Sequence, residues 1–264
     1  MTRIEETFKI LREKKKKAFI SFLMAGDPNF DDSLSIIEAL PTAGVDLIEI
    51  GIPFTDPMAD GRAIQLAGQR AIASGTTLQS VLTLVSKFRQ TNQKTPVVLM
   101  GYFNPIATMG VENFLSNCKT SGVDGLIIVD LPPEEDQELC TPTLKAGLNF
   151  IRLVTPTSDN ARLEKLMQNT SGFLYYVSIT GITGAQSPET NSIQKSINQL
   201  KNHTQLPICV GFGVKTPQIA KEIAKIADGV VVGSAIVEKI ANNASKSEII
   251  NFCKSLADAT HSVS

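Results

Sequence analysis

The chain has 264 residues, of which 42% are hydrophobic and 19% charged, and its 25 basic and 26 acidic side chains nearly cancel. Nucleic-acid-binding proteins normally carry a clear basic excess, so this charge balance argues against that class. The composition is typical of a soluble globular protein, and the length suits either one barrel-sized domain or two small domains.

The N-terminal segment is rich in charge and lacks the apolar core of a signal peptide. The sequence contains no run of about 18 apolar residues, the length that a transmembrane helix needs. The four cysteines are far apart and form no CxxC pair, so we expect reduced thiols and no zinc site. These features predict a cytoplasmic protein with no membrane segment. The lysine run at 14–17 is short and isolated, and we interpret it as a solvated helix end that follows an extra N-terminal helix.

Short apolar runs bounded by Gly, Pro or Asp alternate with longer amphipathic segments along the whole chain. Such runs predict eight buried strands, over 18–25, 45–52, 96–102, 123–130, 148–154, 172–178, 207–212 and 228–233. The segments between them predict helices over 31–40, 78–88, 111–118, 134–144 and 161–167, the last capped by Asp159 or Asn160, and further helices from about 216 and after 234.

Near-continuous apolar strands that alternate with helices indicate a parallel sheet covered by helices. We therefore predict an α/β fold of the (β/α)8 TIM-barrel type, with one domain over 1–264. An open doubly wound sheet is the alternative. The connections over 53–77 and 179–192, which follow the second and sixth strands, are predicted to be long loops of the kind that bind or cover ligands.

Glu49 is a charged residue inside an apolar strand. Strand alternation places it on the face that points into the barrel, near the C-terminal mouth where barrel enzymes hold their catalytic groups. Burial would raise the pKa of this carboxyl group toward neutrality, which suits a general acid or base. The alternative is a buried salt bridge.

Asp60 lies at the start of a predicted helix. From the residues alone, capping is at least as good an explanation as catalysis for both Asp60 and Asp56.

Glycines follow three successive predicted strands, in the segments 181–184, 211–213 and 233–234. Glycine lets backbone N–H groups approach an anion, and barrels often bind phosphate after their seventh and eighth strands. The joint placement predicts a phosphate site there.

Some chemistries have no candidate residues. The strand cores contain no lysine for a Schiff base, and the two histidines, His203 and His261, lie away from strand ends and are expected at the surface. No GxGxxG motif follows the first strand. We therefore expect no metal and no cofactor in this chain.

The segment LIEIGIPFTDPMADGRAIQ at 47–65 closely resembles the α subunits of tryptophan synthase. Further similar stretches are FLMAGDP at 22–28, GVDGLIIVDLPPEE at 122–135, YYVSITGITGA at 175–185, VGFGVKT at 210–216 and VVVGS at 230–234. The resemblance runs from about residue 19 to 236 in one order.

This resemblance implies roles for individual residues. Glu49 matches the catalytic glutamate, and Asp60 matches the aspartate that engages the indole nitrogen. Thr183 lies in the loop that closes over the substrate and meets that aspartate. Substrate-binding positions are Phe22, Met100, Tyr102, Ile127, Val129, Leu153, Tyr175, Thr183 and Phe212, and the phosphate positions are Gly184, Gly213, Gly233 and Ser234.

The implied activity is a lyase reaction, the retro-aldol cleavage of indole-3-glycerol phosphate to indole and glyceraldehyde 3-phosphate. A β subunit that carries pyridoxal phosphate is the implied partner, in an αββα assembly that receives the indole. Two residues depart from the family pattern: Arg62 and Val129 each stand where proline is common. Another phosphosugar barrel enzyme, such as an isomerase, and a non-catalytic regulatory subunit are the rival interpretations.

Overall fold

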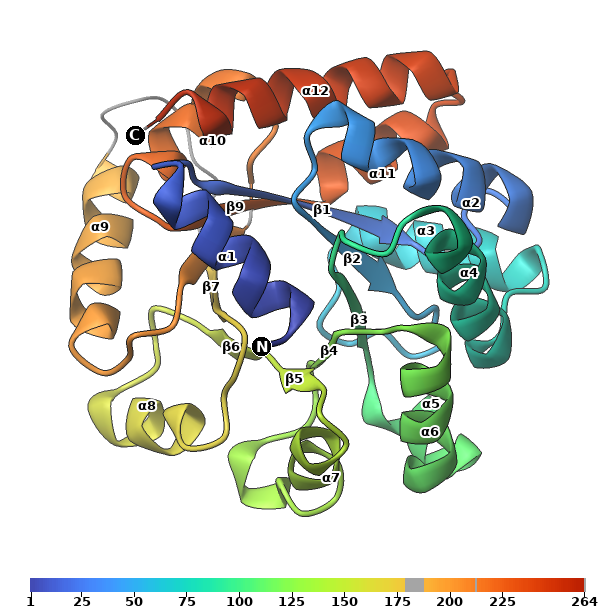
Figure 1. Cartoon of the computed structure of the whole chain (residues 1–264), viewed down its shortest axis with the longest axis horizontal. Helices are drawn as coiled ribbons and strands as arrows, with labels where there is room; N and C mark the ends of the chain where they lie inside the picture. The colour runs from blue at the N-terminus through green and yellow to red at the C-terminus, as the bar shows by residue number, and fades with distance from the viewer. Residues whose placement is uncertain (179–187, 212, 264) are drawn as a thin grey trace.

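The computed structural model describes residues 1–178, 188–211 and 213–263, and these contain nine strands that form one parallel sheet (Figure 1). The order across the sheet is β5-β4-β3-β2-β1-β9-β8-β7-β6. The strands are β1 (Ala18–Met24), β2 (Leu47–Gly51), β3 (Val97–Gly101), β4 (Gly125–Ile128), β5 (Asn149–Phe150), β6 (Arg152–Val154), β7 (Leu174–Val177), β8 (Ile208–Gly211) and β9 (Gly229–Val232).

The two ends of this sheet are consecutive in the chain and are separated by Ile151 alone. The Ile151 N–H donates to the Leu126 carbonyl of β4 at 2.9 Å, and the Ser171 N–H donates to the Phe150 carbonyl at 2.9 Å. β5 and β6 are therefore one strand that pairs with β4 in its first half and with β7 in its second half. This strand closes the sheet into a barrel, which confirms the predicted (β/α)8 fold and excludes the open doubly wound sheet.

Helices surround the strands (Figure 1). They are α1 (Arg3–Glu13), α2 (Phe30–Ala39), α3 (Arg62–Ala73), α4 (Leu78–Thr91), α5 (Phe103–Met109), α6 (Val111–Ser121), α7 (Cys140–Lys145), α8 (Asn160–Met167), α9 (Pro188–Lys201), α10 (Pro217–Ala224), α11 (Ser234–Ala241) and α12 (Lys246–His261), with short 3-10 helices at Leu40–Ala43 and Pro133–Glu135. Asp159 caps α8 as predicted, because its carboxylate accepts from the Arg162 N–H at 2.8 Å. None of the helices in the described ranges is both long enough and apolar enough to cross a membrane.

The long connection after β2 contains the helix that was predicted to start at Asp60, which is α3. The second predicted loop is shorter than expected, because 188–192 belongs to α9; residues 179–187 lie outside the described ranges. The predicted helix at 134–144 is a 3-10 turn followed by α7, because Pro142 has no N–H donor for the preceding turn and is tolerated only in the first turn of a helix, where α7 places it. His261, expected at the surface, is partly exposed: its side chain is 17% exposed and its Nε2 lies 2.8 Å from Asp46 Oδ2.

The barrel has an apolar interior that is separate from the layer between strands and helices. Alternate residues along the strands point inward, among them Ile20, Leu47 and Val98. On the face shown in Figure 1, α1 lies across the barrel, and its buried residues Ile4, Phe8 and Leu11 pack against this interior. The interior is therefore filled at the N-terminal ends of the strands, and its other end is where the predicted site residues gather.

Candidate active site

Glu49 is fully buried in the barrel interior. Leu47 of the same strand belongs to the interior cluster, whereas Ile48 and Ile50 pack on the helix side, so alternation turns the Glu49 side chain inward. Neither carboxylate oxygen has a hydrogen-bond partner among the described residues. Burial without compensation raises the pKa of Glu49 from 4.5 to about 8. The salt bridge that the sequence left open is absent from the described part of the chain, and Glu49 holds a proton at neutral pH.

Tyr175 of β7 and Cys209 of β8 share this interior with Glu49. Burial raises the pKa of both side chains well above their usual values, and a negative charge on Glu49 adds to the shift in each case. Gly211 leaves room for Tyr175, because a Cβ at this position would lie 2.3 Å from the tyrosine hydroxyl. The phenol and thiol therefore stay neutral, and Glu49 is the group among these three that can exchange a proton near neutral pH.

An apolar wall lies around the mouth of the barrel beside Glu49. Phe22 is the β1 partner of Glu49 in register, and its Cζ would lie 2.7 Å from a Cβ on Gly51. The bare backbone of Gly51 therefore accommodates the phenyl ring. The predicted substrate-binding residues on neighbouring strands complete this wall, with Ile127 fully buried and the others partly buried: Met100, Val129 and Leu153.

Asp60 does not cap a helix. Gly61 is the N-cap of α3 and supplies no side-chain bond, and Asp56 instead accepts from the Thr55 hydroxyl at 2.6 Å. The Asp60 side chain is half-buried, and burial raises its pKa from 3.8 to about 6, although a hydrogen bond with Tyr102 acts in the opposite direction. The capping interpretation is thus wrong for both aspartates, and Asp60 titrates in a range that matters for catalysis.

Tyr102 connects the Asp60 loop to the end of β3. Its hydroxyl accepts from the Ala59 N–H at 3.0 Å and bonds the Asp60 carboxylate, while its ring lies 5.3 Å from that of Phe54. Burial, opposed in part by the Ala59 bond, raises the pKa of Tyr102 to about 12, so the hydroxyl stays protonated and donates a hydrogen bond to the Asp60 carboxylate.

An ion pair that no sequence pattern indicated anchors α3. The Arg70 guanidinium binds the fully buried Asp27 carboxylate with both arms, at 2.7 and 2.8 Å. Asp27 follows β1, so this pair ties the helix after the Asp60 loop to the neighbouring strand end. Because 43 residues separate the partners, no local pattern reports the contact.

Backbone groups at the ends of β8 and β9 form the candidate phosphate site. The two strands pair in register, so their ends lie together, and Gly213 has a φ of 74°, a conformation that suits glycine. Gly233 is the N-cap of α11 without a side-chain bond, and Ser234 is its first residue. No side chain of the N-cap residue therefore bonds the first-turn amides of α11, and this helix N-terminus is suited to bind an anion.

Three predicted residues, Thr183, Gly184 and Phe212, lie outside the described ranges. The two departures from the family pattern are described: Arg62 is the exposed first residue of α3, and Val129 packs at the barrel interior. Within the described ranges, His, Cys, Asp and Glu side chains nowhere gather in a group of three or more that could hold a metal ion.

A closed parallel barrel with a protonatable carboxyl group at the C-terminal end of a strand and an open helix N-terminus nearby defines a (β/α)8-barrel enzyme. The family model described as "Tryptophan synthase alpha chain" matches residues 8–261. The chain therefore belongs to the tryptophan synthase alpha chain family, whose members are enzymes of tryptophan biosynthesis.

Solved structures agree with this family. The subunit alpha of tryptophan synthase from Legionella pneumophila str. Paris is 37% identical, with a TM-score of 0.92 and coverage of 100% of both chains. A chain of tryptophan synthase from Mycobacterium tuberculosis is 31% identical, with a TM-score of 0.90 and coverage of 98% of each chain.

Proposed function

We propose that the chain catalyses the retro-aldol cleavage of indole-3-glycerol phosphate to indole and glyceraldehyde 3-phosphate. The observation that carries the proposal is Glu49, a buried carboxyl group with a pKa of about 8 that faces an apolar wall. An indole ring needs such an apolar surface, and the reaction needs a group that both gives and takes a proton.

Glu49 supports both proton transfers of this reaction. In its neutral form the carboxyl group donates a proton to C3 of the indole ring, which makes the ring an acceptor for the electrons of the breaking bond. The carboxylate then accepts the proton of the side-chain hydroxyl as the C–C bond breaks and the aldehyde forms. Glu49 ends with the proton it began with, so the cycle balances.

Asp60 supports the intermediate through its charge. Protonation of C3 leaves positive charge at the ring nitrogen, and an ionised carboxylate placed there stabilises that charge. Because the pKa of Asp60 is about 6, the group is mostly ionised above that pH. Its bond with Tyr102 orients the carboxylate.

The backbone at the ends of β8 and β9 binds the phosphate group of the substrate. Backbone amides beside Gly213, Gly233 and Ser234 would hold this end of the substrate and so align the bond to be broken. Thr183 and Gly184 are assigned to substrate closure and to the cradle from the family resemblance alone.

We further propose that indole passes to a β subunit that carries the pyridoxal phosphate, in an αββα assembly. Met58, in the loop that carries Asp60, is 81% exposed, and Leu66 of α3 is 43% exposed. Exposed apolar side chains this close to the site are suited to contact a partner protein, and such a contact would change the conformation of the Asp60 loop. Asn104 and Pro105, which lie in the first turn of α5, would extend this surface.

The deciding experiment measures indole release from indole-3-glycerol phosphate by wild type and Glu49→Gln, each with and without a β subunit. We expect slow release by wild type, stimulation by the partner, and loss of turnover in a folded variant. The kcat/KM of wild type should rise through about pH 6, where Asp60 ionises, and fall above about pH 8, where Glu49 loses its proton.

Near-normal turnover by Glu49→Gln would contradict the assignment. An inactive wild type that still stimulates the β subunit would favour the regulatory interpretation, and turnover of a phosphosugar without an indole ring would favour an isomerase.

A further inference from the structure

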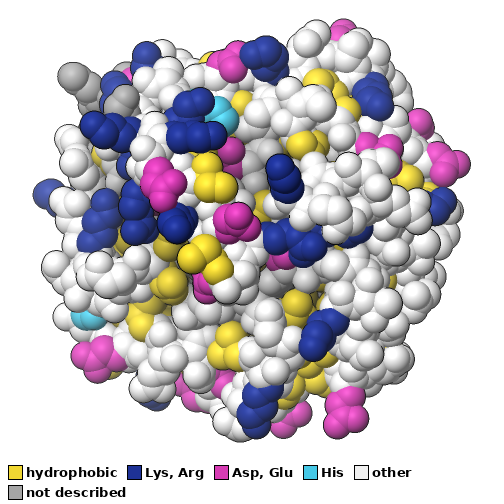
Figure 2. All heavy atoms as spheres, viewed as in Figure 1, with side chains coloured by type: hydrophobic (Ala, Val, Ile, Leu, Met, Phe, Trp, Pro, Cys, Tyr) yellow, Lys and Arg dark blue, Asp and Glu magenta, His cyan; other side chains and the backbone are white. Residues whose placement is uncertain are grey.

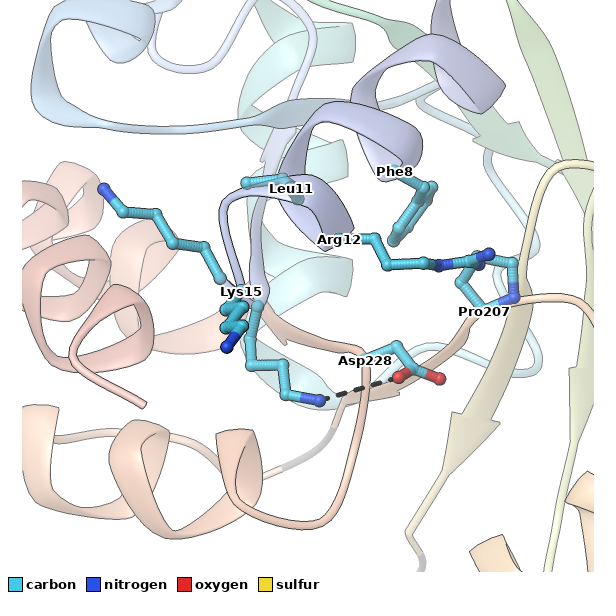
Figure 3. A pocket seen from close by; sticks show the side chains of 8 residues that line it. Phe8, Leu11, Arg12, Lys15, Pro207 and Asp228 are labelled. Atoms are coloured by element: carbon cyan, nitrogen blue, oxygen red, sulfur yellow. Dashed lines mark ion pairs between the residues drawn. The ribbon is translucent and has the colours of Figure 1, made fainter. Parts of the chain in front are cut away.

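A second hollow lies at the opposite end of the barrel from Glu49. It is lined by residues of α1 and the turn after it, and by Pro207 and Asp228, which precede β8 and β9 (Figure 3). Its volume is about 240 Å³. Phe8, Leu11 and Pro207 form an apolar side, and Arg12, Lys15, Lys16 and Lys17 surround it with positive charge.

The protein neutralises only part of the positive charge in this basic hollow. Lys17 lies 3.7 Å from Asp228, the pair marked by the dashed line in Figure 3, and Asp228 is the one carboxylate in the lining. Arg12, Lys15 and Lys16 have no ion pair within the described ranges. Figure 2 shows Lys and Arg side chains gathered on this face of a chain whose charges otherwise nearly cancel. Like charges at this spacing repel one another, so their clustering opposes folding.

Helix-dipole stabilisation accounts for Arg12, which lies in the last turn of α1, but not for the three lysines that follow the helix. Cations favour the last turn of a helix, but the effect fades beyond that turn, and α1 ends at Glu13. The carbonyls of Ile10, Leu11 and Arg12 already accept from the N–H groups of Lys14, Lys16 and Lys15. The lysine side chains are therefore not needed to satisfy the end of α1.

The backbone at Lys15 adds independent support. Its φ is 52°, the left-handed conformation that glycine normally supplies after a helix. A lysine here costs backbone free energy that a glycine would avoid. Its presence adds one more cation to the lining of the hollow, whereas the Arg12 guanidinium extends toward Pro207 (Figure 3).

We propose that this basic hollow binds a small organic phosphate, an ester with an apolar body. The phosphate would contact Arg12, Lys15 and Lys17, and the apolar body would lie on Phe8 and Pro207. The volume falls below the roughly 300 Å³ at which pockets for drug-sized ligands begin, so the body is about the size of one ring. Since Arg12 belongs to α1 and Pro207 precedes β8, the ligand joins the N-terminal helix to the barrel.

Calorimetric titration with phenyl phosphate and with inorganic phosphate tests the proposal. The site variant is Arg12→Ser/Lys15→Ser. The matched control is Lys119→Ser/Lys145→Ser, which removes two lysines from the last turns of α6 and α7. We expect wild type to show a second site for phenyl phosphate beyond the catalytic one, and the site variant to bind there at least about tenfold more weakly. The control should bind as wild type does, and indole release should be unchanged in both.

A second variant protects the test against misfolding. Asp228→Asn removes the one negative charge of the hollow and keeps an oxygen that can accept from the Ile208 N–H, so phenyl phosphate should bind several-fold more tightly. Equal binding by wild type and the site variant, or an equal loss in the control, would overturn the proposal. So would equal affinity for inorganic phosphate and phenyl phosphate, because the apolar side would then contribute nothing.

Discussion

The buried Glu49 should make the protein less stable as the pH rises, and Glu49→Gln should remove this dependence. Burial raises the pKa of the native group to about 8, while the unfolded chain has the ordinary value of 4.5. Between these values the native state keeps a proton that the unfolded state releases, so the free energy of unfolding falls with increasing pH. Below pH 4.5 both states are protonated and no penalty applies.

The size of the effect follows from the two pKa values. At about 1.36 kcal/mol for each pH unit, the penalty reaches about 5 kcal/mol above pH 8 and about 3 kcal/mol at pH 7. Glutamine has nearly the same volume and cannot ionise. Its buried amide lacks partners too, but that cost does not vary with pH, so the slope is the quantity to measure.

Urea unfolding of wild type and Glu49→Gln at about pH 5 and about pH 8 measures this slope. Wild type should lose about 3 kcal/mol more than the variant over this interval. Glu112→Gln, which changes an exposed glutamate of α6, serves as the control and should follow wild type. If wild type and Glu49→Gln lose stability in parallel, the proton on Glu49 has been assigned wrongly.

Two further substitutions test the geometry around the site. Tyr102→Phe removes the hydroxyl that lowers the pKa of Asp60. The acid limb of the kcat/KM profile should therefore move above about pH 6, and kcat/KM should fall about tenfold. An unchanged acid limb would show that the Tyr102 hydroxyl does not affect the ionisation of Asp60. Gly51→Ala places a Cβ 2.7 Å from Phe22 Cζ and should lower the free energy of unfolding by about 1–3 kcal/mol in urea titrations. The same change in a Phe22→Leu background should cost less, and an equal cost in both backgrounds would show that the ring is not what the Cβ meets.

Sequence patterns predicted the barrel because buried parallel strands and their covering helices leave a strong periodic signal. Glu49 was visible for the same reason, since one charge interrupts an apolar strand. The prediction of one helix over 134–144 was wrong because the apolar spacing continues across Pro142, which a helix cannot hold in its interior.

Contacts through space explain most of what the sequence did not reveal. Asp60 was ambiguous because a capping residue and a catalytic aspartate occupy the same kind of position, and the structure excludes the cap because Gly61 is the N-cap of α3. Arg70 gave no signal at all, since its importance depends on Asp27, which lies on another element.

The closing strand of the barrel constrains how the gene can change. Along 150–154 the side chains alternate without interruption, with Phe150 and Val154 on the helix side and Ile151 and Leu153 on the inside. A single inserted codon beside Ile151 would reverse every later side chain of the strand, sending Leu153 outward and turning Arg152 inward. Insertions and deletions at this position should therefore be rare among related sequences. A split or circularly permuted version of the chain should have its new ends elsewhere.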